Sequence, residues 1–337
     1  MHIRYATDPT QVNSNYRAYQ PMEAIARKGH EVSYNGQGPA FTAELATADV
    51  VHVHRFLGGD AQSAVEALRA RGVGLVWDND DDIANLPKSN PLYSKFGGAS
   101  RAGLVRVLQA MLRTVDVVTT PSSVLADRFR AAGAHDVRVI ENYLPDSFPG
   151  AKAPKRPGVN VVWLAALEHQ VDYQQLRLRD TLLRLLDAHG DLRIISIGLG
   201  LGLSSDRYEH LPHVDFLSLP RELARADVGI APLADMPWNQ AKSNVKLKEY
   251  GAAGLPWLAS PVGPYLGLGE REGGALVPED AWYEALDRLI ADARTRKKLA
   301  KRAAKWAKGQ TISKHVGEWE AVYRDAQASA VERRKGG

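Results

Sequence analysis

Short apolar runs alternate with amphipathic stretches along almost the whole chain, and this alternation limits the possible folds more than any other feature. A short apolar run bounded by turn residues is typical of a buried strand, and apolar residues three to four apart are typical of a helix. Strands that alternate with helices form βαβ units, whose strands lie parallel. The expected strands of the first series are residues 2–7, 30–35, 49–55, 74–80, 116–121 and 137–142, and the expected helices are residues 16–29, 61–72, 101–115 and 122–133.

A proline-rich segment at residues 144–158 interrupts this pattern and is typical of a linker between domains. A second alternating series follows and ends in a long helical region. We therefore predict an α/β protein with two doubly wound parallel-sheet domains that face each other, and ligands in the cleft beyond the carboxyl ends of the strands. The expected strands of the second series are residues 159–166, 192–198, 214–218, 227–233, 256–261 and 274–278.

The length and composition of the chain exclude several classes of protein and of catalytic site. A length of 337 residues fits two domains better than one. The chain has no cysteine, which excludes disulfides, thiolate catalysis and cysteine-ligated zinc. It shows neither a signal-peptide pattern nor an apolar run of membrane-spanning length, so we expect a cytoplasmic protein for which peripheral membrane contact stays open.

The formal net charge of +4 comes largely from basic residues in 294–309 and 332–337. Such runs are typical of solvated helix faces, so we expect no stable nucleic-acid partner. The P-loop, nucleophile-elbow and H-E-x-x-H patterns are all absent from the sequence. The GLGLGL run that begins at Gly198 lacks the dinucleotide spacing, so it predicts a tight turn close to a ligand rather than an NAD site.

Three lysines lie within seven residues at the start of an expected helix, in KSNVKLKEYGAAGLP. Lys242, Lys246 and Glu249 share one helical face, and Ser243 or Asn244 could cap the helix. Cations at a helix start oppose the helix dipole by roughly 0.3–1 kcal/mol each, unless an anion docks there. Two interpretations stay open at this point: a diphosphate-binding helix start with Glu249 reading sugar hydroxyls, or a solvated helix with a Lys–Glu pair.

The chain resembles glycosyltransferases of the GT-B fold, and is most similar to the family-4-type retaining enzymes. The most specific likeness is at residues 226–265, which resemble the donor-binding segment of that family. AYQPMEAIARKGHEV, VIENYLPDSF and HVGEWEAVYRDA resemble its N-terminal helix, its approach to the linker and its C-terminal crossing helix. The resemblance implies an acceptor-side domain at 1–145 with a crossing helix at about 314–332, a linker at 146–158 and a donor domain at 159–313.

The resemblance also implies roles for residues of the second domain. Glu249 matches the acidic residue that binds the ribose, and Lys246 could neutralise the departing diphosphate. The loop containing His169 and Asp172 would lie near the cleft. The first of the two glutamates found in much of the family is replaced here by Ala241. With Gly198 from the tight turn described above, the predicted donor-binding residues are His169, Gly198, Lys242, Ser243, Asn244, Val245, Lys246 and Glu249.

An acidic loop, VWDNDDDIANLP, directly follows an expected strand of the first domain. Its aspartates would raise one another's pKa unless they bind a partner. We prefer hydroxyl binding, with Asp78 or Asp80 closest to the chemistry and Asp81 beside them; a metal site and helix capping by Asp81 or Asp82 are the alternatives. The candidate catalytic residues are Asp78, Asp80, Lys242 and Lys246.

Polar residues at other strand ends complete the predicted site. His52 and His54 share a strand face, but without a third ligand in view they are interpreted as structural. The loop after the first strand and the segment before the linker both carry side chains suited to sugar hydroxyls. The further candidates for the acceptor or sugar are Asn13, Asn15, Tyr16, Arg17, Arg55, Asp81, Asn142 and Tyr143.

Together these features predict a hexosyltransferase that moves a sugar from a nucleotide-diphosphate sugar to an acceptor hydroxyl with retention, and needs no cofactor. The acceptor could be a carbohydrate, lipid, protein or small molecule. Three other functions stay open: a nucleotide-sugar epimerase, a DNA-modifying glycosyltransferase, and a non-catalytic nucleotide-sugar-binding relative. The sequence names neither the donor nor the acceptor.

Overall fold

The computed structural model describes residues 1–7, 14–35, 44–55, 59–88, 90, 93 and 101–336. These residues form two six-stranded sheets in which every pairing is parallel. The strand orders are β2-β1-β3-β4-β5-β6 and β12-β11-β10-β7-β8-β9. In each sheet, strands are therefore added first on one side of the first strand (β1 or β7) and then on its other side. The predicted fold class is confirmed: each half is a doubly wound, Rossmann-like α/β unit.

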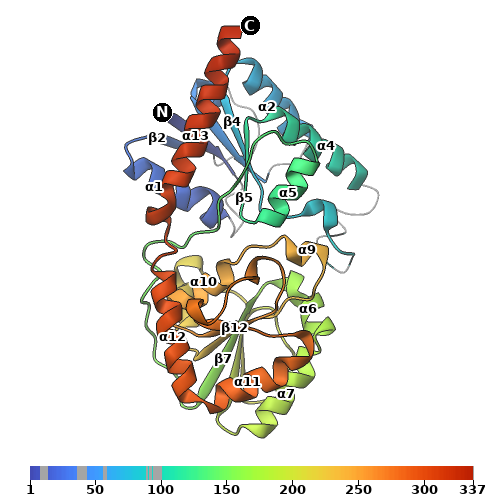
Figure 1. The fold of residues 1–337 in the computed structure, drawn as a ribbon, viewed down its shortest axis with the longest axis vertical. Helices are drawn as coiled ribbons and strands as arrows, with labels where there is room; N and C mark the ends of the chain where they lie inside the picture. The colour runs from blue at the N-terminus through green and yellow to red at the C-terminus, as the bar shows by residue number, and fades with distance from the viewer. Residues whose placement is uncertain are drawn as a thin grey trace.

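The N-terminal half contains the first sheet and the helices that cover it (Figure 1). Its π-helical turn η1, Asn15–Tyr19, runs directly into helix α1. The strands are β1 His2–Ala6, β2 Glu31–Asn35, β3 Val50–His54, β4 Gly74–Asp78, β5 Val117–Thr120 and β6 Val137–Val139, and the helices are α1 Gln20–Arg27, α2 Gly59–Ala70, α4 Arg101–Thr114 and α5 Ser123–Ala131.

The C-terminal half repeats this arrangement around the second sheet. Its strands are β7 Val159–Ala165, β8 Leu192–Gly198, β9 Tyr208–Leu211, β10 Val228–Ala231, β11 Trp257–Ala259 and β12 Gly274–Leu276. Its helices are α6 Gln170–Gln175, α7 Leu178–Ala188, α8 Leu219–Leu223, α9 Pro237–Gln240, α10 Val245–Ala252, α11 Trp282–Ala291 and α12 Ala293–Ala307.

One expected strand is wrong. Residues 214–218 were expected to be a strand, but the structure places β9 at Tyr208–Leu211 and a short 3₁₀ turn at Phe216–Ser218. β9 is a partly exposed edge strand, so its sequence lacks the apolar run that marks a buried strand. The apolar residue Phe216 instead packs against Tyr16 and Phe148.

The central strands of each sheet are buried on both faces, which is why they are mostly apolar. In β4, Leu75 and Trp77 belong to one apolar cluster and Val76 belongs to another, because successive side chains point to opposite faces. In β7, Val161 and Val162 are divided in the same way.

The last helix, α13 Ile312–Gly336, returns to the N-terminal half and packs against α1 and β4 (Figure 1). Its Trp319 and Tyr323 are fully buried, and the Tyr323 hydroxyl lies 2.9 Å from the Tyr5 hydroxyl. Residues 145–158 contain no helix or strand. The domain boundaries given by the sequence stay a prediction. Among the described residues, no helix has the length and apolar character needed to cross a membrane.

A glycine in β10 sets how closely helix α10 approaches the second sheet. A Cβ atom on Gly229 would lie 2.5 Å from the Tyr250 ring. Tyr250 in turn donates to the Ile230 carbonyl at 2.6 Å and accepts from the Leu164 N–H at 3.0 Å. The absence of a side chain at Gly229 therefore lets Tyr250 anchor α10.

We expect Gly229→Ala to lower the free energy of unfolding by about 1–3 kcal/mol, because a well-packed site must make room for a methyl group. Gly103→Ala, in α4, is the matched control. Nothing lies within 4 Å of its added Cβ, so it should stabilise the protein by about 0.5–1 kcal/mol. Urea unfolding of both variants tests this, and a Gly229→Ala variant as stable as the parent would contradict the packing argument.

Candidate active site

A cleft of about 490 Å³ lies between the two halves, at the carboxyl ends of strands from both sheets. It collects most of the residues predicted from the sequence. Those predicted residues that line it are Tyr16, Arg55, Asp80, Asp81, Asn142, His169, Gly198, Lys242, Ser243, Val245, Lys246 and Glu249.

Helix α10 begins at this cleft. Asn244 is its N-cap residue, but its side chain makes no capping hydrogen bond and instead donates to Glu141 in the N-terminal half at 3.2 Å. The first N–H groups of a helix have no partner within the helix, and they carry the positive end of its dipole. Because Ser243, Val245 and Lys246 line the cleft, this helix start is suited to an anion.

Lys246 belongs to a hydrogen-bonded chain. Its ammonium group donates to Nε2 of His169 at 3.1 Å, and Nδ1 of His169 lies 2.7 Å from Asp172. Burial, followed by the positive charge of Lys242, lowers the pKa of Lys246 to about 8. Burial, followed by the charge of Lys246, lowers the pKa of His169 to about 4. At neutral pH the lysine is therefore mostly charged and the histidine neutral.

Lys242 lies just before the helix start, on the same side of the cleft. Its ammonium group is 3.8 Å from Glu168 Oε1 and 5.3 Å from the centre of the Trp238 ring. Burial alone would raise the pKa of Glu168, but Lys242 and His169 lower it to about 2. Glu168 and Trp238 also line the cleft, although neither is among the residues predicted from the sequence. The available signals in the sequence were that Glu168 directly precedes His169 and that Trp238 comes shortly before Lys242.

Glu249 lies one turn further into α10 and is 5% exposed. It accepts a hydrogen bond from the Tyr16 hydroxyl, which comes from the N-terminal half. Burial raises the pKa of Glu249 to about 7. The carboxyl group that we expected to bind hydroxyl groups of a ligand therefore already accepts a hydrogen bond from a hydroxyl group of the protein.

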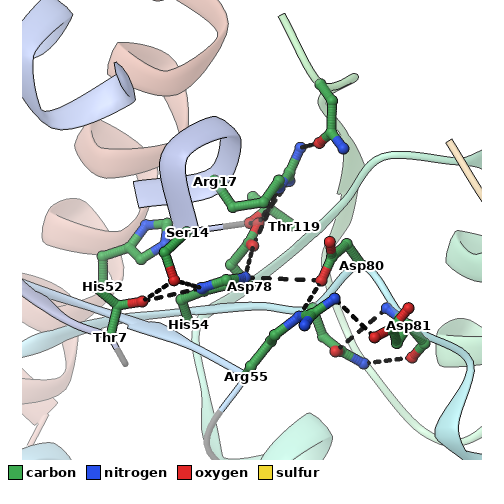
Figure 2. A network of polar contacts seen from close by, with 12 residues as sticks. Thr7, Ser14, Arg17, His52, His54, Arg55, Asp78, Asp80, Asp81 and Thr119 are labelled. Atoms are coloured by element: carbon green, nitrogen blue, oxygen red, sulfur yellow. Dashed lines mark hydrogen bonds and ion pairs between the residues drawn. The ribbon is translucent and has the colours of Figure 1, made fainter. Parts of the chain in front are cut away.

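The acidic loop divides into a structural and a cleft-facing part. Asp78 is fully buried outside the cleft lining, where Arg17 donates to it at 2.5 Å and Thr119 at 2.5 Å (Figure 2). Burial opposes ionisation, but the guanidinium group of Arg17 holds the pKa of Asp78 below its ordinary value. The sequence predicts that Asp78 and Arg17 each contact a ligand, whereas the structure pairs them with each other.

Asp80 and Asp81 do face the cleft, and Arg55 binds both of them (Figure 2). Despite burial, Arg55 and His54 hold the pKa of Asp80 below its ordinary value, whereas burial raises the pKa of Asp81. Arg55 has a φ of 64°, in the left-handed region that non-glycine residues rarely adopt. Such strain is often stored at ligand sites.

For the helix-capping alternative, the structure gives Asp82 a different set of hydrogen bonds. Asp82 is the N-cap residue of the 3₁₀ turn Ile83–Asn85 but makes no capping hydrogen bond, and it accepts instead from Arg128 and from the Asn85 side chain. Within the described residues, no group of three or more His, Asp or Glu side chains could hold a metal ion.

None of the remaining candidates that the structure describes lines the cleft. Asn13 falls outside the described residues, and Asn15 starts η1 without lining the cleft. Tyr143 stacks on His315 at 3.7 Å, away from the lining. His52 is buried and stacks on the Tyr5 ring.

Three comparisons with known proteins bear on this geometry. No protein-family model and no curated protein sequence matches the chain. Solved structures do match it along nearly its full length. Sucrose-phosphate synthase from Thermosynechococcus elongatus matches with a TM-score of 0.70 at 15% identity, over 98% of this chain and 100% of that one.

The chain has the GT-B glycosyltransferase fold.

Two further structures of this fold were solved with a nucleotide. HepE of Anabaena, in complex with UDP and glucose, has a TM-score of 0.67 at 14% identity and covers 95% of this chain and 99% of that one. An α-glucosyltransferase, in complex with UDP and a 13-mer DNA containing an HMU base, has a TM-score of 0.66 at 12% identity and covers 96% and 99%. At these identities the likeness establishes the fold.

We expect Arg17→Met to lower the free energy of unfolding by about 3–5 kcal/mol, because it leaves the buried Asp78 without its counter-charge. Adding Asp78→Asn should recover part of this loss. Arg138→Met, which breaks an exposed pair with Asp136, is the control and should cost less than about 1 kcal/mol. If Arg17→Met unfolds like the parent in denaturant, the pair does not have the structural role assigned to it.

The raised pKa of Glu249 predicts a pH dependence of stability. The folded carboxyl group keeps its proton up to about pH 7, whereas the unfolded one loses it near 4.5. Stability from this group is therefore fully present below pH 4.5 and is lost as the pH rises through 7. Glu249→Gln should lose less stability between pH 5.5 and 8 than the parent, measured by urea unfolding. An unchanged pH dependence would contradict the assignment.

Proposed function

We propose that this protein transfers a sugar from a nucleotide-diphosphate sugar to an acceptor hydroxyl group. One observation carries the proposal: the start of α10, with Lys242 and Lys246, meets the buried carboxyl group of Glu249 inside a cleft between two Rossmann-like halves. A diphosphate and an adjacent ribose have the chemistry that this combination recognises.

The diphosphate would bind at the start of α10. Negative charge develops on this group as the bond to the sugar breaks, so the fixed N–H groups and the two ammonium groups stabilise the transition state more than the ground state. Closure of the two halves around the cleft would exclude water and limit hydrolysis of the donor.

Glu249 would accept hydrogen bonds from the ribose. Its present partner, the hydroxyl group of Tyr16, is the same kind of donor that a ribose would offer. We therefore propose that nucleotide binding replaces the Tyr16 contact, or shares the two carboxyl oxygens with it.

The sugar would be recognised mainly from the opposite wall. The family's first glutamate is absent here: Ala241 is buried, and its carbonyl accepts from Ser122 at 2.8 Å, so this position is used to join the two halves. Asp80 and Asp81, held by Arg55 across the cleft, are the side chains we propose for contacts with sugar or acceptor hydroxyls.

We propose retention at the anomeric carbon. Asp80 is a weak base, because Arg55 lowers its pKa, so the leaving diphosphate would take the acceptor proton. Inversion would instead require a protein base, for which Asp81 is the candidate because burial raises its pKa. The coupling constant of the anomeric proton in the product distinguishes the two outcomes by NMR.

UDP-sugars are the first donors to test, because two neighbours of the same fold were solved with UDP. In a thermal-shift panel of UDP-, GDP-, ADP-, CMP- and dTDP-sugars, we expect one nucleotide family to raise the Tm by mass action. Lys242→Ala and Glu249→Ala should each reduce this shift, whereas Lys297→Ala, on the exposed face of α12, should leave it unchanged.

Two results would count against the proposal. If no nucleotide sugar in the panel shifts the Tm, the cleft is not a donor site of this kind. If both site variants bind the donor as tightly as the parent, the donor lies elsewhere. A bound donor whose sugar is converted without any acceptor would instead indicate an epimerase, and NMR of the sugar detects this conversion.

A further inference from the structure

Asp172, on the short helix α6, is 1% exposed and uses both carboxylate oxygens. Oδ2 lies 2.7 Å from Nδ1 of His169. Oδ1 accepts from the N–H of Ala234 at 2.9 Å and from the side-chain amide of Asn239 at 2.7 Å. Asp172 does not itself line the cleft, so its role must act through these partners.

The first partner leads to Lys246. A carboxylate accepts hydrogen bonds, so Nδ1 of His169 carries the proton and Nε2 presents a lone pair. The Lys246 ammonium group donates to that lone pair at 3.1 Å. Asp172 therefore selects the one histidine tautomer that can hold an ammonium group.

The second pair of partners leads to Lys242. Ala234 and Asn239 belong to the connection from β10 through α9, and the Asn239 side chain also donates to the Ala234 carbonyl at 2.9 Å. The backbone N–H of Lys242 donates to the Asn239 carbonyl at 3.2 Å. The carboxylate that fixes this connection therefore also fixes the backbone from which Lys242 extends.

We propose that Asp172 is a positioning residue that directs the ammonium groups of Lys246, through His169, and of Lys242, through Asn239, at the diphosphate of the donor. This inference rests on the proposed function. Two flexible, like-charged side chains that converge on one anion lose conformational entropy and repel each other. A buried anion linked to both by hydrogen bonds reduces both costs.

The first test is Asp172→Asn. The asparagine oxygen can still accept from Ala234 or Asn239, but its amide group would face Nδ1 of His169 as a donor. The histidine would then carry its proton on Nε2 and could not accept from Lys246. We expect the affinity for UDP to fall on the order of tenfold, the size expected when a hydrogen bond to a charged group is lost.

The readouts separate positioning from general support of the fold. The ¹⁵N shifts of the His169 ring should report a proton on Nδ1 in the parent and on Nε2 in Asp172→Asn. The alkaline loss of UDP affinity should move to lower pH, because the negative charge of Asp172 helps to keep Lys246 protonated. The other groups facing Lys246, namely Lys242, Glu168 and Glu249, are unchanged in this variant.

Asp287→Asn is the matched control. Asp287 binds His189 at 2.7 Å in the same half, and neither residue lines the cleft, so UDP affinity should not change. His169→Leu provides a second route if Asp172→Asn does not fold. It should weaken UDP binding in the parent background but have little further effect with Lys246→Met, because both changes remove the same interaction.

The outcomes distinguish this inference from the proposed function. If the parent does not bind UDP or any other nucleotide of the panel, the proposed function fails and the inference fails with it. If the parent binds UDP and both Asp172→Asn and His169→Leu bind it equally well, the inference alone is overturned. Additive effects of His169→Leu and Lys246→Met would also overturn it, because Lys246 would then not act through the histidine.

Discussion

Two neighbouring residues at the end of the N-terminal half, Glu141 and Asn142, hold helix α10 against the cleft. The fully buried ammonium group of Lys248 donates to Glu141 at 2.6 Å and to the Asn142 carbonyl at 3.1 Å, and the Asn142 side chain donates to Ser243 at 3.1 Å. A buried ammonium group without such partners would cost several kcal/mol. This pairing therefore fixes where the positive start of α10 faces the N-terminal half.

The Asn142 side chain also connects α10 to the acidic loop. Arg17 donates to the Asn142 side chain at 3.1 Å and binds Asp78, so one set of hydrogen bonds connects the end of β4 to the start of α10. One wall of the cleft carries the lysines and helix N–H groups, with Glu168 and Glu249 beside them, and the other carries Asp80 and Asp81 paired with Arg55. This separation suits a ligand with an anionic part and a part rich in hydroxyl groups.

The sequence predicted two doubly wound sheets, and it placed the start of α10 at the cleft. Both could be predicted because periodicity and strand ends are local properties. It did not predict what depends on contacts between distant residues. Nothing near Arg17 shows that it points inward to Asp78, and nothing near Tyr16 shows its contact with Glu249, 233 positions away. The edge strand β9 was missed for a different reason, since its exposure removed the apolar pattern.

The most direct test of the account is the backbone amide NMR spectrum of the start of α10 during titration with UDP, and then with GDP and ADP. A diphosphate bound as we propose would accept hydrogen bonds from these amides, so the signals of Val245 and Lys246 should shift along a saturating curve with at least one nucleotide. Saturable binding that leaves both signals unmoved and shifts amides elsewhere would contradict the account, as would the absence of any shift with all three nucleotides.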